Sequence, residues 1–125
     1  MGIDIYMRWD GQTDKEIEAQ YEGFDITIGH LGYLREAYFK DSIFSTKMLL
    51  KEGFEGDSPA FITLSSKVLQ ERLDLAVKLH QVRQKNAYNL NVEETDPSAK
   101  SFKDFVALHT KLEKEGKRPR IVVDY

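Results

Sequence analysis

Residues 65 to 88 carry the longest helical pattern of the chain, and this pattern limits the fold more than any other feature. Ser65 is a suitable N-cap, and Leu64 and Leu69 have the spacing of a hydrophobic staple. The polar residues fall on one continuous arc: Gln70, Glu71, Asp74, Lys78, Gln81 and Lys85. Apolar residues fill most of the remainder: Val68, Leu69, Leu73, Leu75, Ala76, Leu79 and Val82. We therefore expect a central helix that is covered on more than one side.

Both ends of the chain have the pattern of β-strands. Apolar and polar side chains alternate from residue 2 to residue 9, with Ile3, Ile5 and Met7 on one face. Residues 120 to 125 form a short segment in which three apolar residues, Ile-Val-Val, are flanked by charged residues. Because terminal segments fray unless something ties them down, we expect the two terminal strands to pair with each other. Residues 24 to 28 also alternate and predict a third strand.

Further helices are marked by their end signals. Thr13 and Glu16 form a capping box that begins a short helix. The last helix opens at Ser98 or Ser101 and ends at Gly116.

The region from Phe39 to Pro59 fits either a strand or a short helix that starts near Ser42 or Ser45, and we favour the helix.

These elements predict an α+β fold in one domain, residues 1 to 125. The sheet is expected to be small, mixed or antiparallel, and to contain the N-terminal strand, residues 24 to 28 and the C-terminal strand. Three to four helices should pack mainly on the face that carries Ile3, Ile5 and Met7. A chain of this length forms a core of its own without disulfides or metal.

Composition excludes several classes of function. The net charge of −3 gives no overall field toward nucleic acid or anionic lipid, so nucleic acid is an unlikely partner. The chain has no cysteine, which removes disulfides, thiolate metal sites and cysteine nucleophiles. No apolar run is long enough for a membrane span, and the N-terminal residues do not resemble a signal peptide. We expect a cytoplasmic protein.

The common catalytic motifs are absent from the sequence. There is no GxGxxG, P-loop, HExxH, EF-hand loop or GxSxG. We therefore expect no cofactor and lean against an enzyme. The three histidines are too scattered to predict a metal site, and we expect His80 and His109 to be hydrogen-bonded core or boundary residues on the apolar faces of their helices.

Two arginines interrupt the apolar arc of the central helix. Arg72 and Arg83 lie about 20° apart on the helical wheel, and His80 falls on the same broad face. In the structural interpretation, their stems cover the core while the guanidinium groups reach water or an internal carboxylate such as Glu36. In the functional interpretation they line a cleft that binds a carboxylate or a phosphate, with Arg8 and Arg35 as contributors.

The segment from Gly29 to Phe39 crowds several reactive residue types together. We interpret it as a strand-to-helix junction in which Gly29 or Gly32 makes the turn. Backbone N–H groups at such a junction can bind an anion, and His30 is of the residue type that transfers protons near neutral pH.

Three stretches, GIDIYMRWDG, GHLGYLREAYF and KSFKDFVAL, carry a resemblance that spans most of the chain. They look like a family of small uncharacterised bacterial proteins, that is, conserved hypothetical proteins of unknown function. The resemblance implies a bacterial, intracellular, single-domain protein, and it implies no activity, ligand or partner.

Two functions follow as hypotheses. The first is a non-enzymatic interaction module whose aromatic surface, with or without a sheet edge, binds a second copy or another protein; its residues are Trp9, Tyr33, Tyr38 and Phe39. The alternative is a protein or enzyme that binds a small anion, a phosphate or a carboxylate, near Gly29 to Arg35; its residues are His30, Gly32, Tyr33, Arg35, Arg72, His80 and Arg83.

Overall fold

The two terminal strands lie side by side at the centre of a four-stranded antiparallel sheet. A computed structural model describes residues 2–22, 26–38, 44–88 and 97–125 of the chain. Its strands are β1 (Gly2–Arg8), β2 (Tyr33–Ala37), β3 (Ala60–Ile62) and β4 (Arg120–Asp124), in the order β2-β1-β4-β3. Ile5 of β1 stands opposite Val123 of β4. The expected pairing of the chain ends and the α+β class are confirmed.

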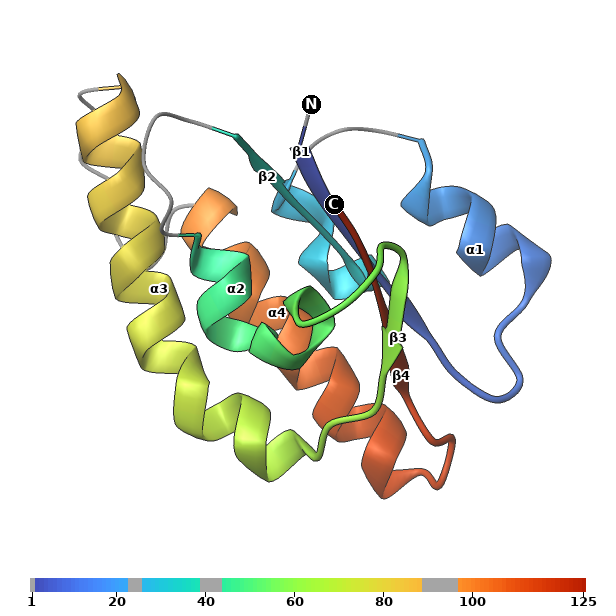
Figure 1. Cartoon of the computed structure of the whole chain (residues 1–125). Helices are drawn as coiled ribbons and strands as arrows, with labels where there is room; N and C mark the ends of the chain where they lie inside the picture. The colour runs from blue at the N-terminus through green and yellow to red at the C-terminus, as the bar shows by residue number, and fades with distance from the viewer. Residues whose placement is uncertain (1, 23–25, 39–43, 89–96) are drawn as a thin grey trace.

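Four α-helices accompany this sheet in the described parts of the chain. They are α1 (Asp14–Gln20), α2 (Ser45–Leu49), α3 (Ser66–Tyr88) and α4 (Pro97–Lys114), with 3₁₀ helices η1 (Ile26–Leu31) and η2 (Lys51–Phe54). Figure 1 shows α2, α3 and α4 together on one side of the sheet, whereas α1 lies apart from them. The helix favoured near Ser45 is confirmed as α2, and the last helix begins at Pro97 rather than at Ser98 or Ser101.

The core lies between the sheet and these three helices. Burial alternates along β1, where Ile3, Ile5 and Met7 are at most 1% exposed. They belong to one apolar cluster that also contains Phe102 and Phe105 of α4. Alternate side chains of a strand point to opposite faces, so the other face of β1 carries Asp4, Tyr6 and Arg8, as the alternation predicts.

A buried glutamine fixes α1 beside the end of β1. The predicted capping box is present, since the Glu16 N–H donates to Thr13 Oγ1 and the Thr13 N–H donates to Glu16 Oε1. At the other end of α1, Gln20 is fully buried and its Nε2 donates to the Leu31 carbonyl at 2.7 Å and to the Met7 carbonyl at 3.2 Å. This side chain ties α1 to both η1 and β1.

The prediction of a strand at residues 24 to 28 is wrong, because residues 26 to 28 belong to the 3₁₀ helix η1. Residues 24 and 25 lie outside the described part of the chain. The strand follows at β2, so the junction runs from helix to strand and not from strand to helix. Gly32 makes this turn with φ of +87°. The alternation of β2 is hidden in the sequence because its buried face carries a charged residue, Glu36, beside Leu34.

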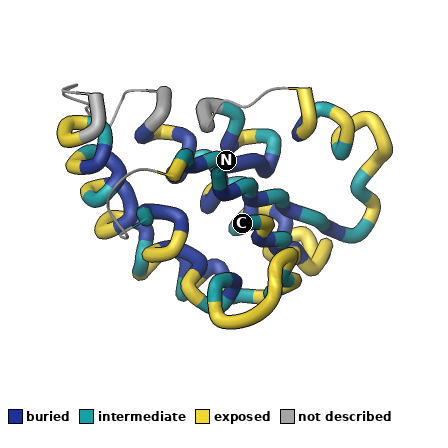
Figure 2. Tube along the Cα trace, turned by 45° about the horizontal axis from the view of Figure 1, so that its top comes forward, coloured by how far each residue is buried: buried dark blue, intermediate teal, exposed yellow. Residues whose placement is uncertain are grey.

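The apolar residues of α3 are not all covered. Leu69, Ala76 and Val77 are buried against the core, whereas Leu75 is 57% exposed and Val82 is 53% exposed. Figure 2 shows this division along the helix, with buried residues on one side and exposed residues on the other. Within the described chain, the expectation of cover on more than one side is therefore not met.

Candidate functional site

A cavity of about 260 Å³ opens where α1, η1 and α4 meet. Most of the surface that lines it is apolar, although half of the lining residues are polar: Trp9, Thr13, Lys15, Glu16, Ala19, His30, Leu31 and Leu108. His30 and Trp9, which sequence reasoning assigned to two different surfaces, therefore line the same cavity.

The polar groups at this cavity differ in whether they form hydrogen bonds within the protein. Glu16 is held by the capping box, because Thr13 donates to it from both its backbone and its hydroxyl. Lys15 and His30 make no hydrogen bond or ion pair with other described residues, and both are exposed. Their nitrogen atoms remain available to a ligand that enters the cavity. An apolar wall with two nitrogen-bearing side chains at its rim suits a small carboxylate with an apolar body.

The two glycines of the predicted junction are explained by close packing. A Cβ atom at Gly29 would lie 1.9 Å from the Ser101 carbonyl oxygen of α4, so only glycine lets η1 approach that helix. The Gly29 N–H instead donates to Ser101 Oγ at 2.9 Å. A Cβ atom at Gly32 would lie 2.8 Å from Gln20 Nε2. The Gly29 N–H therefore has an internal partner.

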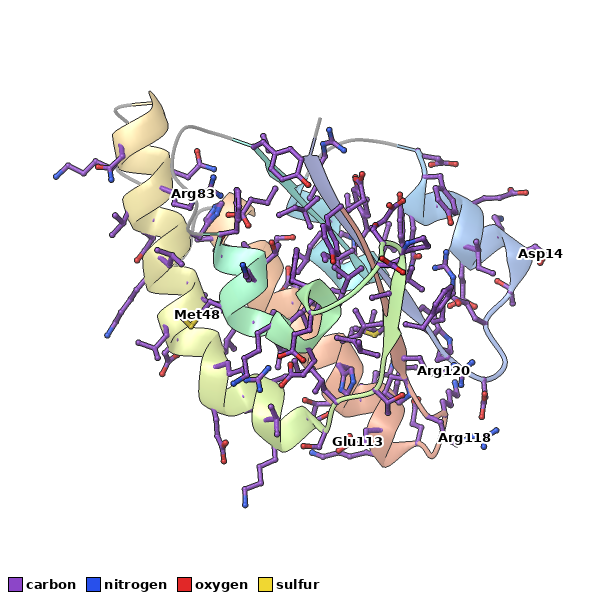
Figure 3. The ribbon with its side chains drawn as sticks, viewed as in Figure 1. Asp14, Met48, Arg83, Glu113, Arg118 and Arg120 are labelled. Carbon is purple, nitrogen blue, oxygen red and sulfur yellow. The ribbon has the colours of Figure 1, made fainter. Side chains whose placement is uncertain are left out.

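Arg83 contacts the segment from Gly29 to Phe39 through a buried carboxylate, that of Glu36. Its guanidinium pairs with Glu36 of β2, and each side chain of the pair is 5% exposed. Figure 3 shows Arg83 extending from α3 toward the rest of the molecule. Ser45 and Thr46, at the start of α2, also donate to Glu36 from their backbone N–H groups, at 3.0 and 2.9 Å, and from their hydroxyls. The internal carboxylate of the structural interpretation is thus the observed partner of Arg83.

Arg72 points to a different partner. Its two terminal nitrogen atoms donate to the two oxygen atoms of Glu52 at 2.8 and 2.7 Å, and it also donates to the Leu49 carbonyl. This pairing lowers the pKa of Glu52 to about 2. The structure does not bring Arg72 together with Arg83, because each binds a separate carboxylate.

The two helix histidines are buried. His80 is 3% exposed, with its ring centre 5.1 Å from that of Phe102, and His109 is fully buried. The Nδ1 atom of His109 lies 2.7 Å from Ser66 Oγ. Burial lowers the pKa of His109, although nearby Glu113 opposes this shift. These are the core positions that the sequence predicts, and no metal-binding cluster of His, Asp and Glu is found among the residues described.

Tyr33 and Arg35 lie on the sheet face opposite the core. The Tyr33 hydroxyl donates to Asp4 at 2.6 Å, and Arg35 donates to the same Asp4 oxygen at 2.8 Å. Burial and the Asp4 carboxylate raise the pKa of Tyr33. Burial, with the same carboxylate contributing, raises the pKa of Tyr6 to about 12. Both phenols therefore stay neutral near neutral pH.

A row of apolar and aromatic side chains crosses this face on all four strands. Tyr33 of β2 stands opposite Tyr6 of β1, Tyr6 opposite Val122 of β4, and Val122 opposite Phe61 of β3. The rings of Tyr33 and Tyr6 stack with centres 5.3 Å apart. Exposure rises along the row, since Tyr33 is 1% exposed and Phe61 is 77% exposed. We call these four residues the cross-strand row.

The aromatic residues of the predicted interaction surface differ in how far they are exposed. Trp9 is 8% exposed and Tyr33 is buried, whereas Tyr38 is 39% exposed and packs edge-on against Phe44. Phe39 lies outside the described residues. Sequence reasoning missed Phe61, whose only signal is its place between two apolar residues after Pro59, and it missed Lys15, for which no sequence signal exists.

No protein-family model, characterised protein or solved structure matches the chain. The resemblance to a bacterial family therefore stays a prediction. None of the described helices is both long and apolar enough to cross a lipid bilayer.

Proposed function

We propose that the protein is a non-enzymatic interaction module that binds an extended segment of another protein at the exposed end of the cross-strand row. The observation that carries the proposal is Phe61, a large apolar side chain that is 77% exposed on an edge strand. Exposed aromatic side chains are favoured at protein interfaces. The aromatic surface expected from the sequence thus shifts to the end of the row that water reaches.

The edge position of β3 supports an extended partner. The sheet order ends at β3, which pairs on one side with β4. A strand added to such an edge gains main-chain hydrogen bonds, and its side chains pack on those of the edge strand. Since β3 has only three residues, we expect weak and reversible binding.

The charges beside the row are of both signs. Asp124 and Asp4 stand opposite each other on β4 and β1, but Arg35 pairs with Asp4, and Arg8 stands opposite Arg120 on the same face. Since the chain has a net charge of −3, this mixed surface provides no positive field that would attract a phosphate backbone.

Site-specific crosslinking tests the proposal. A photoreactive phenylalanine analogue is placed at Phe61 and, as a matched control, at exposed Thr63, and the proteins are irradiated in cells. We expect a protein adduct from position 61 alone that maps to an extended segment. In a pull-down, Phe61→Asp should lose this partner while Phe61→Tyr keeps it, with both variants as stable as the parent. Adducts with nucleic acid, or equal adducts at both positions, would overturn the proposal.

A second candidate function rests on the cavity. Lys15 and His30 lie at a largely apolar cavity that is large enough for a small carboxylate. This keeps the small-anion alternative near Gly29 to Arg35, with Lys15 in place of Arg72 and Arg83, which are paired internally.

Trp9 provides the test of this second candidate, because it is the only tryptophan and lines the cavity. Its fluorescence is followed during titration with benzoate, hexanoate and inorganic phosphate. We expect a saturable change with the two carboxylates that disappears in Lys15→Ala and persists in Lys47→Ala, an exposed lysine on α2. No saturable change with any of the three anions would exclude the candidate.

A further inference from the structure

A second apolar surface runs along α3, away from the core. Its residues recur at alternating spacings of four and three, the heptad spacing of helices that pair: Val68, Arg72, Leu75, Leu79, Val82 and Asn86. We call the four apolar members, Val68, Leu75, Leu79 and Val82, the α3 seam. Leu75 and Val82 are more than half exposed, although they lie on the longest helix of the structure.

The α3 seam is distinct from the side of the helix that packs on the core. The core side carries Leu69, Leu73, Ala76 and Val77, all at most 9% exposed. The two surfaces lie next to each other around the helix, so the partner of the seam would lie beside the core helices and not beside the sheet. Figure 2 shows the exposed side of α3 facing outward.

The charges that flank the α3 seam select its partner. Glu71, Lys78 and Lys85 follow one another at intervals of seven along one edge of the seam, so its start is acidic and its end is basic. All three are exposed. When two copies pair antiparallel about a two-fold axis, Glu71 of each faces Lys85 of the other. In a parallel pair these charges would instead face the other flank of the partner's helix, where Leu69, Ala76 and Arg83 are buried against the core, so Glu71 and Lys85 would not meet.

We infer that α3 is a self-association surface through which two copies of the chain pair antiparallel. In this register Leu75 of one copy faces Leu79 of the partner subunit, and the pair buries both apolar seams. Lys78 meets Lys78 of the partner subunit near the two-fold axis, and since Lys78 is exposed, both long side chains can turn away from each other into water. The two-sided cover that the sequence predicts for this helix is then supplied by the second copy.

Sedimentation equilibrium of the full chain, from micromolar to millimolar concentration, tests the inference. We expect a monomer–dimer equilibrium for the parent protein and a monomer for Leu75→Asp and for Val82→Asp. Both positions are more than half exposed, so both variants should fold, and far-UV circular dichroism checks this. A parent protein that stays monomeric throughout would overturn the inference.

Charge reversal tests the antiparallel arrangement. Lys85→Glu places like charges opposite each other twice in the dimer, and we expect dissociation to become easier by about tenfold at low salt. Glu71→Lys combined with Lys85→Glu restores both pairs with reversed polarity, so the affinity should return to that of the parent. A double variant that is weaker than the single variant would contradict the antiparallel pairing.

Phe61→Asp separates this inference from the proposed function. The substitution removes the exposed end of the cross-strand row, which lies on β3 and not on α3. We expect it to leave the monomer–dimer equilibrium unchanged. If Phe61→Asp abolishes the dimer while Leu75→Asp does not, the self-association surface is the sheet and the inference is wrong.

Discussion

Arg72 and Arg83 occupy the same apolar arc of one helix, and yet they form ion pairs of different kinds. The side chains of Arg83 and Glu36 are each 5% exposed, whereas those of Arg72 and Glu52 are 20% and 32% exposed. The comparison teaches that position on a helical wheel does not decide whether a charge is buried. The element that packs over the charge decides it.

The two carboxylates show how this difference arises. Glu36 accepts hydrogen bonds from Ser45 and Thr46 as well as from Arg83, and the Phe44 ring lies 4.9 Å from the Arg83 guanidinium carbon. The start of α2 therefore closes over this pair. Glu52 has a bidentate partner in Arg72 and stays open to water.

The largest expected effect is at Arg83. Arg83→Met leaves the Glu36 carboxylate buried without its cation, and we expect the free energy of unfolding to fall by about 3–5 kcal/mol. Urea denaturation followed by circular dichroism measures this. Glu36→Gln and the double variant complete a mutant cycle in which the two losses should not add, because both break one network. A loss below about 1 kcal/mol in Arg83→Met would contradict a buried pair.

The two ion pairs also show which features of the fold can be predicted from the sequence. The pairing of Arg83 with an internal carboxylate was predictable, since an arginine within an apolar arc needs a partner. Which arginine is buried was not predictable, because it depends on how α2 packs, and the pattern around Ser45 fits a strand as well as a helix. Strand alternation correctly located β1 and β4 but failed at β2, where Glu36 occupies a buried position.

The cavity and the cross-strand row were beyond sequence reasoning for a different reason. Trp9, His30 and Leu108 line one cavity although they lie far apart in the chain. The row likewise joins one residue from each of four strands, and its composition depends on strand order and register. Local spacing carries no information about either.

A smaller effect on stability is expected at His109 of α4, which contacts the opposite end of α3 from Arg83. Its Nδ1 contacts Ser66, the first residue of α3, and burial lowers its pKa below the usual 6.5. The unfolded chain therefore binds a proton more readily, so stability should fall as the pH drops below about 6.5. Denaturation midpoints at about pH 7 and about pH 5 measure this. In His109→Gln the loss between these two values should be smaller, and an equal loss would assign the effect to another group.

Arg72 should show the smallest effect and completes the comparison. Because this pair is partly exposed, Arg72→Met should cost about 1 kcal/mol or less, and the cost should shrink as salt is added. The lowered pKa of Glu52 stabilises the fold above its ordinary value of 4.5, and this contribution is lost as the pH falls from 4.5 to about 2. Arg72→Met should therefore flatten acid unfolding within this window alone, as measured by circular dichroism. If Arg72→Met instead costs as much as Arg83→Met at neutral pH, burial is not what separates the two pairs.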